Sequence, residues 1–217
     1  NLLQFEKQNA DAMHSDGHIN IPNTIESIEF RKVSFTYPNS EKETLKDISF
    51  TLRCPQSTVL VGENGAGKTT IIKLILGFYK PTSGEILING VNIKEYPPEE
   101  YLKLFSVCFQ DYMKYGFSLK DNVVMSNTEI NHQKFEKIIN MVELKDLIID
   151  LPQKEKTCLS REYDENGVEL SGGQYNRIAI ARAIAKDAPI VLFDEPNAAL
   201  DAKAEQSLFK LYAQLTK

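Results

Sequence analysis

The residues with the clearest chemistry occupy positions 62–69, where Gly-Glu-Asn-Gly-Ala-Gly-Lys-Thr fits the pattern G-x-x-x-x-G-K-[ST] without a mismatch. The glycines allow successive backbone N–H groups to curl around phosphates, and Lys68 reaches the β and γ oxygens. The Thr69 hydroxyl can ligate Mg²⁺. An apolar run before the loop, 58–61, and an apolar helix expected over 68–76 supply the context that this motif requires. The alternative is a plain glycine turn between a strand and a helix.

A second anion site is indicated at residues 170–174, Leu-Ser-Gly-Gly-Gln. Ser171 is a natural N-cap, and Gln174 follows three residues later, as a capping box prefers. The glycines between them let backbone N–H groups approach an anion, and the positive end of the following apolar helix adds to the attraction. By itself this segment is only a well-capped helix start. Its place between the phosphate loop and a downstream acidic pair makes it a candidate site.

That acidic pair is Asp194 and Glu195, which directly follow the apolar run 190–193. The run predicts a buried parallel strand, and ligands bind beyond the carboxyl ends of such strands in open α/β sheets. Asp194 suits a partner of Mg²⁺, and Glu195 suits the polarisation of an attacking water. Acidic strand ends also occur for solubility alone, so the prediction depends on the phosphate loop.

Composition narrows the class of protein. The chain has 217 residues, of which 42% are hydrophobic and 25% charged, as in an ordinary globular protein. A net charge of −5 opposes sequence-independent binding of nucleic acid. No apolar run approaches the roughly 20 residues that span a bilayer. Cys54, Cys108 and Cys158 lack metal-ligand spacing and are expected to be small buried hydrophobic residues in a reducing compartment.

The elements that must position these residues follow from periodicity. A strand-like apolar pattern over 28–35 and strict alternation over 48–52 predict strands, and Asn89-Gly90 predicts a tight hairpin within 85–93. Helical spacing over 118–150 predicts a helical insertion. Further strands are expected at 58–61, 105–109 and 189–194, and a last helix near 202–215. Strands mixed with crossover helices indicate an α/β core with parallel strands.

With the phosphate loop, Leu-Ser-Gly-Gly-Gln and Asp-Glu in this order, the chain resembles the nucleotide-binding domain of ABC ATPases over about residues 25–216. The resemblance implies an α/β fold: a P-loop NTPase core with a mostly parallel sheet, an antiparallel β lobe and a helical subdomain. The expected domains are a linker or arm at 1–24 and an ABC ATPase domain at 25–217. Within the domain, the core with its β lobe takes 28–110 and 169–217, and the helical subdomain takes 111–168.

The resemblance also assigns roles to single residues. Tyr37 corresponds to an aromatic residue that stacks on adenine, and Gln110 to a glutamine that senses Mg²⁺ and the attacking water. Asp201 corresponds to an aspartate that helps to join two protomers. The implied catalytic residues are Glu195, Lys68 and Gln110, and the implied metal ligands are Thr69, Gln110 and Asp194. The implied nucleotide-binding residues are Tyr37, Gly62, Glu63, Asn64, Gly65, Ala66, Gly67, Lys68, Thr69, Thr70, Ser171, Gly172, Gly173 and Gln174.

Members of this family work as head-to-tail pairs, in which each phosphate loop closes on ATP against the Ser171–Gln174 segment of the other subunit. Both half-sites occur in this sequence, so the resemblance implies a homodimer that uses ATP and Mg²⁺. The polar segment 1–27 and a partial match of Glu162, Glu165 and Gly167 to the exporter pattern Thr-Glu-Val-Gly-Glu-Arg-Gly imply a permease domain fused upstream. A solvated acidic loop is the alternative for that match.

The implied protein is thus an exporter, of the peptide or lantibiotic kind, at the cytoplasmic face of the cell membrane. The alternatives are an ABC ATPase that is not a transporter and a nucleotide-binding interaction module with little turnover. The family has a histidine after the Asp-Glu pair, whereas His14, His18 and His132 all precede Asp194. We therefore expect a C-terminally truncated chain that binds ATP and hydrolyses it feebly. The membrane domain selects the substrate, which this sequence does not reveal.

Overall fold

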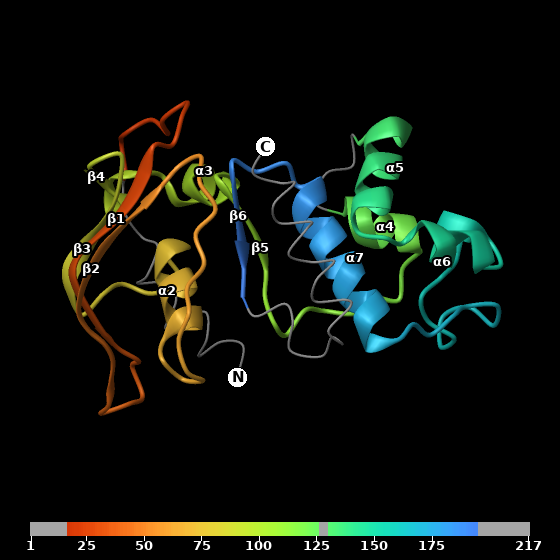
Figure 1. Ribbon diagram of the computed structural model, residues 1–217, viewed down its shortest axis with the longest axis horizontal. Coiled ribbons are helices and arrows are strands. Elements are labelled where there is room, and N and C mark those ends of the chain that lie inside the picture. Colours follow the sequence, from red (N-terminus) through yellow and green to blue (C-terminus); the bar gives the residue numbers. More distant parts are fainter. Residues whose placement is uncertain (1–16, 126–129, 195–217) are drawn as a thin grey trace. The chain divides into compact units, whose positions relative to one another are not determined.

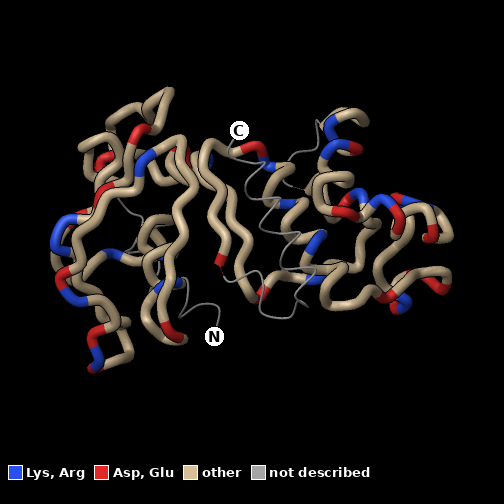
Figure 2. The backbone as a smooth tube through the Cα atoms, in the orientation of Figure 1, with Lys and Arg blue, Asp and Glu red and all other residues tan. Residues whose placement is uncertain are grey.

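The computed structural model of the chain describes residues 17–125 and 130–194, which form two compact units (Figure 1). The first unit runs to Phe105, and the second begins at Ser106. None of the helices described is both long and apolar enough to cross a membrane. Along this part of the backbone, lysine and arginine are interspersed with aspartate and glutamate (Figure 2). Each unit has its own fold.

The first unit contains the expected antiparallel β lobe, a four-stranded sheet of order β2-β1-β3-β4. Its strands are β1 (Ser27–Thr36), β2 (Glu43–Arg53), β3 (Ser83–Ile88) and β4 (Val91–Asn92). In β1 the buried apolar side chains change parity, from Ile28 and Phe30 to Val33 and Phe35. The register shifts between Phe30 and Val33, and Lys32 has a φ of 48°. A bulge thus returns the apolar side chains to the core face.

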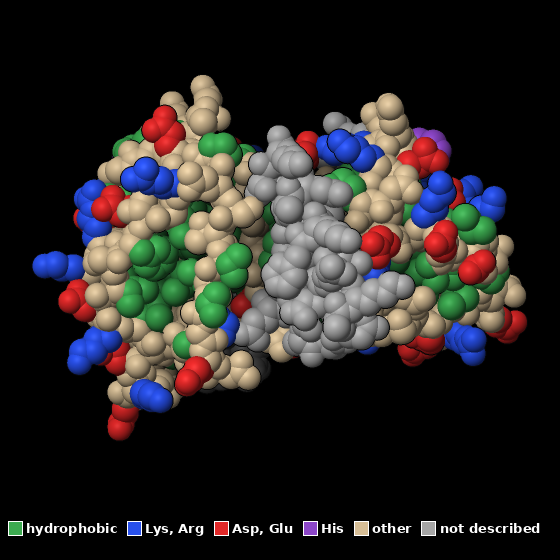
Figure 3. Space-filling view, viewed as in Figure 1, with side chains coloured by type: hydrophobic (Ala, Val, Ile, Leu, Met, Phe, Trp, Pro, Cys, Tyr) green, Lys and Arg blue, Asp and Glu red, His purple; other side chains and the backbone are tan. Residues whose placement is uncertain are grey.

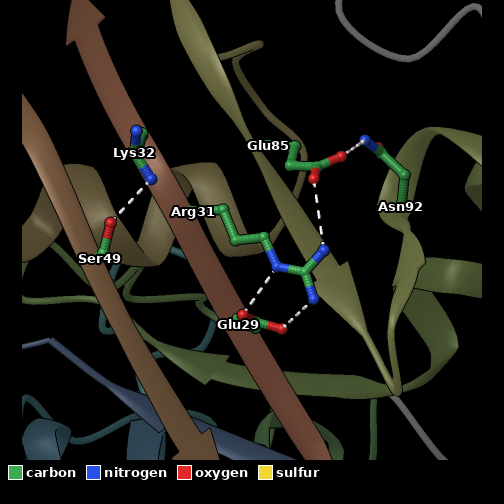
Figure 4. A network of polar contacts seen from close by, with 6 residues as sticks. All are labelled: Glu29, Arg31, Lys32, Ser49, Glu85 and Asn92. Carbon is green, nitrogen blue, oxygen red and sulfur yellow. Dashed lines mark hydrogen bonds and ion pairs between the residues drawn. The ribbon is translucent and has the colours of Figure 1, made fainter.

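On the other face of this sheet, polar side chains link the strands (Figure 4). The Arg31 guanidinium donates to both carboxylate oxygens of Glu29, at 2.7 and 2.8 Å, and lies 3.5 Å from Glu85 on β3. The backbone N–H of Lys32 donates to Ser49 Oγ on β2 over 2.9 Å. These ion pairs are solvent-exposed, so water screens them and they add little to stability. They mark the solvent face of the lobe.

The Asn89-Gly90 hairpin forms as predicted, with φ values of 50° and 81°, the pair of positive angles that a type I′ turn needs. The Asn89 side chain also holds the arm. Its Oδ1 accepts from the N–H groups of Glu26 and Ser27, and its Nδ2 donates to the carbonyl of Thr24 over 2.8 Å. The part of the arm that enters the first strand is therefore fixed to the lobe.

Among the described residues of the first unit, the helices are α2 (Lys68–Ile75), the 3-10 helix η1 (Ile93–Glu95) and α3 (Pro98–Lys103). As predicted, Gly77 terminates helix α2: it lies just beyond the C-cap residue Leu76 and has a φ of 70°. The Phe78 N–H donates to the carbonyl of Lys73, and the Gly77 N–H donates to that of Leu74. This is the Schellman arrangement, in which glycine takes the left-handed position.

The prediction of a strand over 58–61 is wrong for this structure. The segment has no strand assignment and belongs to neither sheet. Val59 and Val61 are 73% and 92% exposed, and hydrophobic side chains gather on the visible face of the first unit (Figure 3). An apolar run becomes a strand only when a neighbouring strand pairs with its backbone groups, and no strand described here does so.

The second unit contains a two-stranded sheet of β5 (Phe105–Cys108) and β6 (Ile190–Phe193), together with helices. Its described helices are α4 (Leu119–Val124), α5 (His132–Met141), α6 (Lys145–Asp150), the 3-10 helix η2 (Lys154–Lys156) and α7 (Gly172–Ala185). Helix α7 packs against α4 and α5 (Figure 1). Its residues 178–181 are all buried, as in a helix covered on most sides. Strand β6 is half-buried, so the expectation of a fully buried strand is wrong.

We predict that Asn89→Gly lowers the free energy of unfolding by about 1–2 kcal/mol, because it removes three hydrogen bonds and keeps the turn conformation. Asn89→Ala is expected to cost about 1 kcal/mol more, since alanine resists a positive φ. Urea denaturation of the two variants measures both losses of unfolding free energy, from the hydrogen bonds and from the turn conformation. Wild-type stability in Asn89→Gly would show that the side chain does not hold the arm.

Candidate nucleotide-binding site

The phosphate loop of the first unit has the backbone conformation that its glycines predict. Gly65 and Gly67 have φ values of 80° and 94°, which L-residues with a Cβ rarely adopt. At Gly67 an added Cβ would lie 2.6 Å from Leu45 Cδ2, whereas at Gly65 it would meet no atom within 4 Å. The loop is thus packed on one side and open on the other. Residues 62–66 are exposed.

Lys68 closes this loop from within. Its Nζ donates to the carbonyls of Gly62 and Glu63, at 2.8 and 3.0 Å. Helix α2 starts after Gly67, which has no side chain that could cap the helix. An ammonium group, a positive helix end and an uncovered loop together suit a phosphate group.

Tyr37 lies beside this helix. Its hydroxyl is 3.0 Å from Thr70 Oγ1, in a hydrogen bond that either group can donate. The Tyr37 ring meets Phe35 and Tyr79 edge to face, and Lys73 Nζ lies 5.9 Å from its centroid. The structure therefore places the predicted adenine-stacking ring next to the helix that begins at the phosphate loop.

The predicted capping box is present at the start of α7. Ser171 Oγ accepts from the Gln174 N–H over 3.3 Å, and Gln174 Oε1 accepts from the Ser171 N–H over 2.8 Å. Gly172 lies outside the left-handed region, and an added Cβ there would meet nothing within 4 Å. Neither conformation nor packing among the described residues requires glycine at this position. A bare backbone here fits the close approach of an outside group.

The loop after Gln110 lies along α7. Tyr112 donates its hydroxyl to the carbonyl of Gly172 over 2.8 Å. Arg182 donates to the carbonyl of Met113, and its guanidinium lies 4.8 Å from the centroid of the Tyr115 ring. Burial raises the pKa of Tyr112, so its hydroxyl stays protonated. Burial lowers the pKa of Arg182, but the guanidinium remains charged. Sequence reasoning missed these residues, because nothing local marks them.

Asp194 is 3% exposed, and its N–H donates to the carbonyl of Cys108 over 2.9 Å. The carboxyl ends of β5 and β6 therefore meet at one edge of their sheet, as parallel strands require. Gln110 follows two residues after Cys108 and is exposed. Burial raises the pKa of the Cys108 thiol to about 11, so this buried cysteine is a neutral packing residue. Cys54 and Cys158, in contrast to the prediction, are only half-buried.

The structure groups the predicted residues by unit. Tyr37, the loop 62–69 and Thr70 share the first unit, while Gln110, Ser171–Gln174 and Asp194 share the second. Glu195 and Asp201 lie outside the residues that the structure describes. Within this described part, no cluster of three or more His, Cys, Asp or Glu side chains could hold a metal ion.

The acidic stretch that contains Glu162 and Glu165 forms a compact turn. The Gly167 N–H donates to the carbonyl of Asp164 over 2.7 Å, and a Cβ on Gly167 would collide with the carbonyl of Ser160. Tyr163 is 75% exposed at this turn. The packing of this turn therefore explains why position 167 is glycine, apart from any role in recognition.

The ABC transporter family matches residues 45–198, a stretch that holds the phosphate loop, the capped glycine segment and Asp194. The chain belongs to the ABC transporter family. It is 40% identical over 206 residues to the subtilin transport ATP-binding protein SpaT of Bacillus subtilis, a match that covers 94% of the chain and 33% of that relative. It is 37% identical over 183 residues to the mitochondrial iron-sulfur clusters transporter ATM1 of Candida glabrata, which covers 84% of the chain and 24% of the relative.

Among solved structures, a bacterial Atm1-family ABC exporter with ATP bound matches 93% of this chain and 36% of its own, with a TM-score of 0.80 and 30% identity. The chain thus spans a quarter to about a third of the length of these relatives. The expected P-loop fold and the ATP-binding ABC ATPase domain of exporter type are confirmed. The roles of the individual site residues stay predictions.

We predict that Gly172→Ala leaves the thermal midpoint and the ATP affinity of the single chain unchanged, because an added methyl group has space in the fold. Turnover of ATP is expected to fall by about 10- to 100-fold, since the methyl group stands where a phosphate must approach the backbone. Calorimetry and phosphate release measure the two effects. Unchanged turnover would contradict an anion-binding role for the bare backbone at Gly172.

Proposed function

We propose that two copies of the chain bind two molecules of Mg²⁺-ATP between them and hydrolyse them to drive export through a membrane domain. The observation that carries this proposal is that one chain presents two different surfaces suited to an anion. One is the loop around Lys68, and the other is the capped, open backbone at Gly172. In a two-fold pair, each surface of one copy meets the other surface of its partner, which yields two equivalent sites.

On the first surface, we assign the backbone of residues 62–67 and the Lys68 ammonium to the β- and γ-phosphates. We assign the Tyr37 ring to adenine, because it lies beside the helix that starts at the loop. Thr69 and Thr70 add hydroxyl groups at the start of α2. The second copy supplies Ser171 Oγ and the glycine backbone N–H groups to the γ-phosphate.

For the metal, the proposed donors are the hydroxyl of Thr69, the amide oxygen of Gln110 and the carboxylate of Asp194. They are hard oxygen ligands, and Mg²⁺ is usually held by one or two carboxylates together with phosphate oxygens. When bound, Mg²⁺ neutralises charge on the phosphates. Glu195, next to Asp194 in sequence, is the proposed general base for the attacking water.

The second unit also offers a surface for a membrane domain. Met113, Phe117 and Tyr163 are 63%, 55% and 75% exposed, and Tyr163 packs on Gly116, next to Phe117. A contiguous patch of exposed apolar side chains can mark a contact with another protein. The similarity to a subtilin transport ATP-binding protein and to a bacterial Atm1-family ABC exporter supports an exporter. For such a protein, the proposed place of this domain is the cytoplasmic face of the membrane.

The partner on this surface is then a permease domain, fused upstream of the arm, and not a nucleic acid. Mixed charges along the described backbone, rather than a basic face, support that choice (Figure 2). A non-transporting ABC ATPase is the second candidate. The polar segment 1–27 and the partial match of Glu162, Glu165 and Gly167 to the exporter pattern favour the exporter over it.

We predict that Lys68→Ala abolishes ATP binding, because the loop loses both its internal tie and its cation. Glu195→Gln is expected to bind ATP normally and to form a long-lived dimer with Mg²⁺-ATP, since the water is no longer activated. Light scattering and phosphate release measure the two outcomes. Glu136→Gln, an exposed acid on α5, is the control and is expected to match the wild type.

Phosphate release by Glu195→Gln at the wild-type rate would exclude Glu195 as the general base. A wild-type chain that binds ATP and never turns it over, alone or with a membrane domain, would favour the interaction module.

We further predict that Phe117→Ser leaves the ATP affinity of the chain unchanged and lowers export by its complex with the membrane domain in reconstituted vesicles. The physical reason is the loss of apolar contact area at the proposed docking surface, about 25 cal/mol per Å². Ile149→Ser, an equally exposed apolar residue on α6, serves as the control. Equal export by the two variants would remove Phe117 from the docking surface.

A further inference from the structure

The Tyr37 ring is held by neighbours that come from three separate segments. Thr70 on α2 bonds its hydroxyl at 3.0 Å. Phe35 on β1 meets it with centroids 4.8 Å apart and planes at 78°, and Tyr79 meets it at 5.2 Å and 85°. Phe35 and Tyr79 also contact each other, with centroids 5.5 Å apart. The three rings form one cluster beside the helix that follows the phosphate loop.

These neighbours restrict different motions of the ring. A hydrogen bond at the phenol oxygen fixes the end of the side chain but still permits rotation about the Cβ–Cζ axis. Rings packed edge to face against Tyr37 resist that rotation, because a turned ring would lose contact or collide. The plane of Tyr37 is therefore set by Phe35 and Tyr79, and not by Thr70.

Tyr79 stands on a segment that is anchored at both ends. Before it, the Schellman bonds at Gly77 close helix α2. After it, the Thr82 N–H donates to the carbonyl of Ser34 over 2.8 Å, and the Thr36 N–H donates to Thr82 Oγ1 over 3.1 Å. Both bonds lead to β1, the strand that precedes Tyr37. The fold thus fixes the position of Tyr79 relative to the ring it contacts.

We propose that Tyr79 is a positioning residue, which holds the Tyr37 ring in the plane that a nucleotide base stacks on. The proposal rests on the proposed function, in which Tyr37 binds the base of ATP. A free tyrosine at the end of a strand must lose side-chain entropy when a base stacks on it. A ring that is already fixed avoids this loss, so the base binds more tightly.

A structural role for Tyr79 makes a different prediction. If Tyr79 only stabilised the lobe, its loss would weaken the binding of every ligand of the phosphate loop alike. As a positioning residue for the base, it contributes to the binding of ATP and not to that of inorganic tripolyphosphate, which has the phosphates without the base. The two ligands separate the two roles without any measurement of turnover.

The experiment is a calorimetric titration of the whole chain with ATP and with tripolyphosphate, both with Mg²⁺. Tyr79→Leu is expected to weaken ATP binding by about threefold to tenfold, the range for loss of an edge-to-face ring contact, and to leave tripolyphosphate binding unchanged. Tyr79→Phe keeps the ring and is expected to restore wild-type affinity for both ligands. Ile149→Ala, which removes an exposed apolar side chain from the second unit, is the control.

Two results would overturn the inference: equal weakening of both ligands by Tyr79→Leu, or wild-type ATP affinity in Tyr79→Leu while Tyr37→Ala loses affinity. If Tyr79→Leu does not fold, Tyr79→Met, which keeps most of the side-chain volume, replaces it with the same expectations.

Failure of the underlying site has other signatures. A wild-type chain that binds neither ligand contradicts ATP binding by the phosphate loop. Equal ATP affinity in the wild-type chain and in Tyr37→Ala would show that Tyr37 does not hold the base. The inference about Tyr79 would then fail as well.

Discussion

Backbone N–H groups can hold a phosphate only where no side chain covers them and where the loop that carries them keeps its shape. Both conditions are met at the start of α2 and of α7. Gly65 leaves its side of the phosphate loop open, and Gly172 leaves the start of α7 open, with no atom near an added Cβ in either case. The rest of each unit supports these two helix starts.

Glycine makes the backbone of a loop accessible and also makes it flexible, so side chains hold each loop in its conformation. Lys68 holds the phosphate loop through the carbonyls of Gly62 and Glu63. Tyr112 holds the carbonyl of Gly172, and the capping box holds the turn before it. Lys68 and Tyr112 both attach to carbonyls, whereas the capping box uses the N–H groups of Ser171 and Gln174.

The second unit connects its functional residues through one helix. Loop residues from Tyr112 to Tyr115 contact α7 at Gly172 and at Arg182, and the Ser106 hydroxyl on β5 donates to the carbonyl of Ala183. The strand that ends before Gln110 and the helix that begins at Gly172 therefore belong to one packed body. Relatives with names as unlike as a subtilin transport ATP-binding protein and an iron-sulfur clusters transporter match this chain over most of its length.

The sequence by itself determined the features that depend on residues close together in the chain. The phosphate loop, the capping box of Ser171 and Gln174 and the Asn89-Gly90 turn all form as predicted, because their bonds join near neighbours. Only the tertiary structure decided the rest. The run 58–61 looked like a strand but has no pairing strand here, and Tyr112 meets Gly172 across 60 positions. Pairing and long-range contacts depend on where the chain brings distant segments, which no local pattern records.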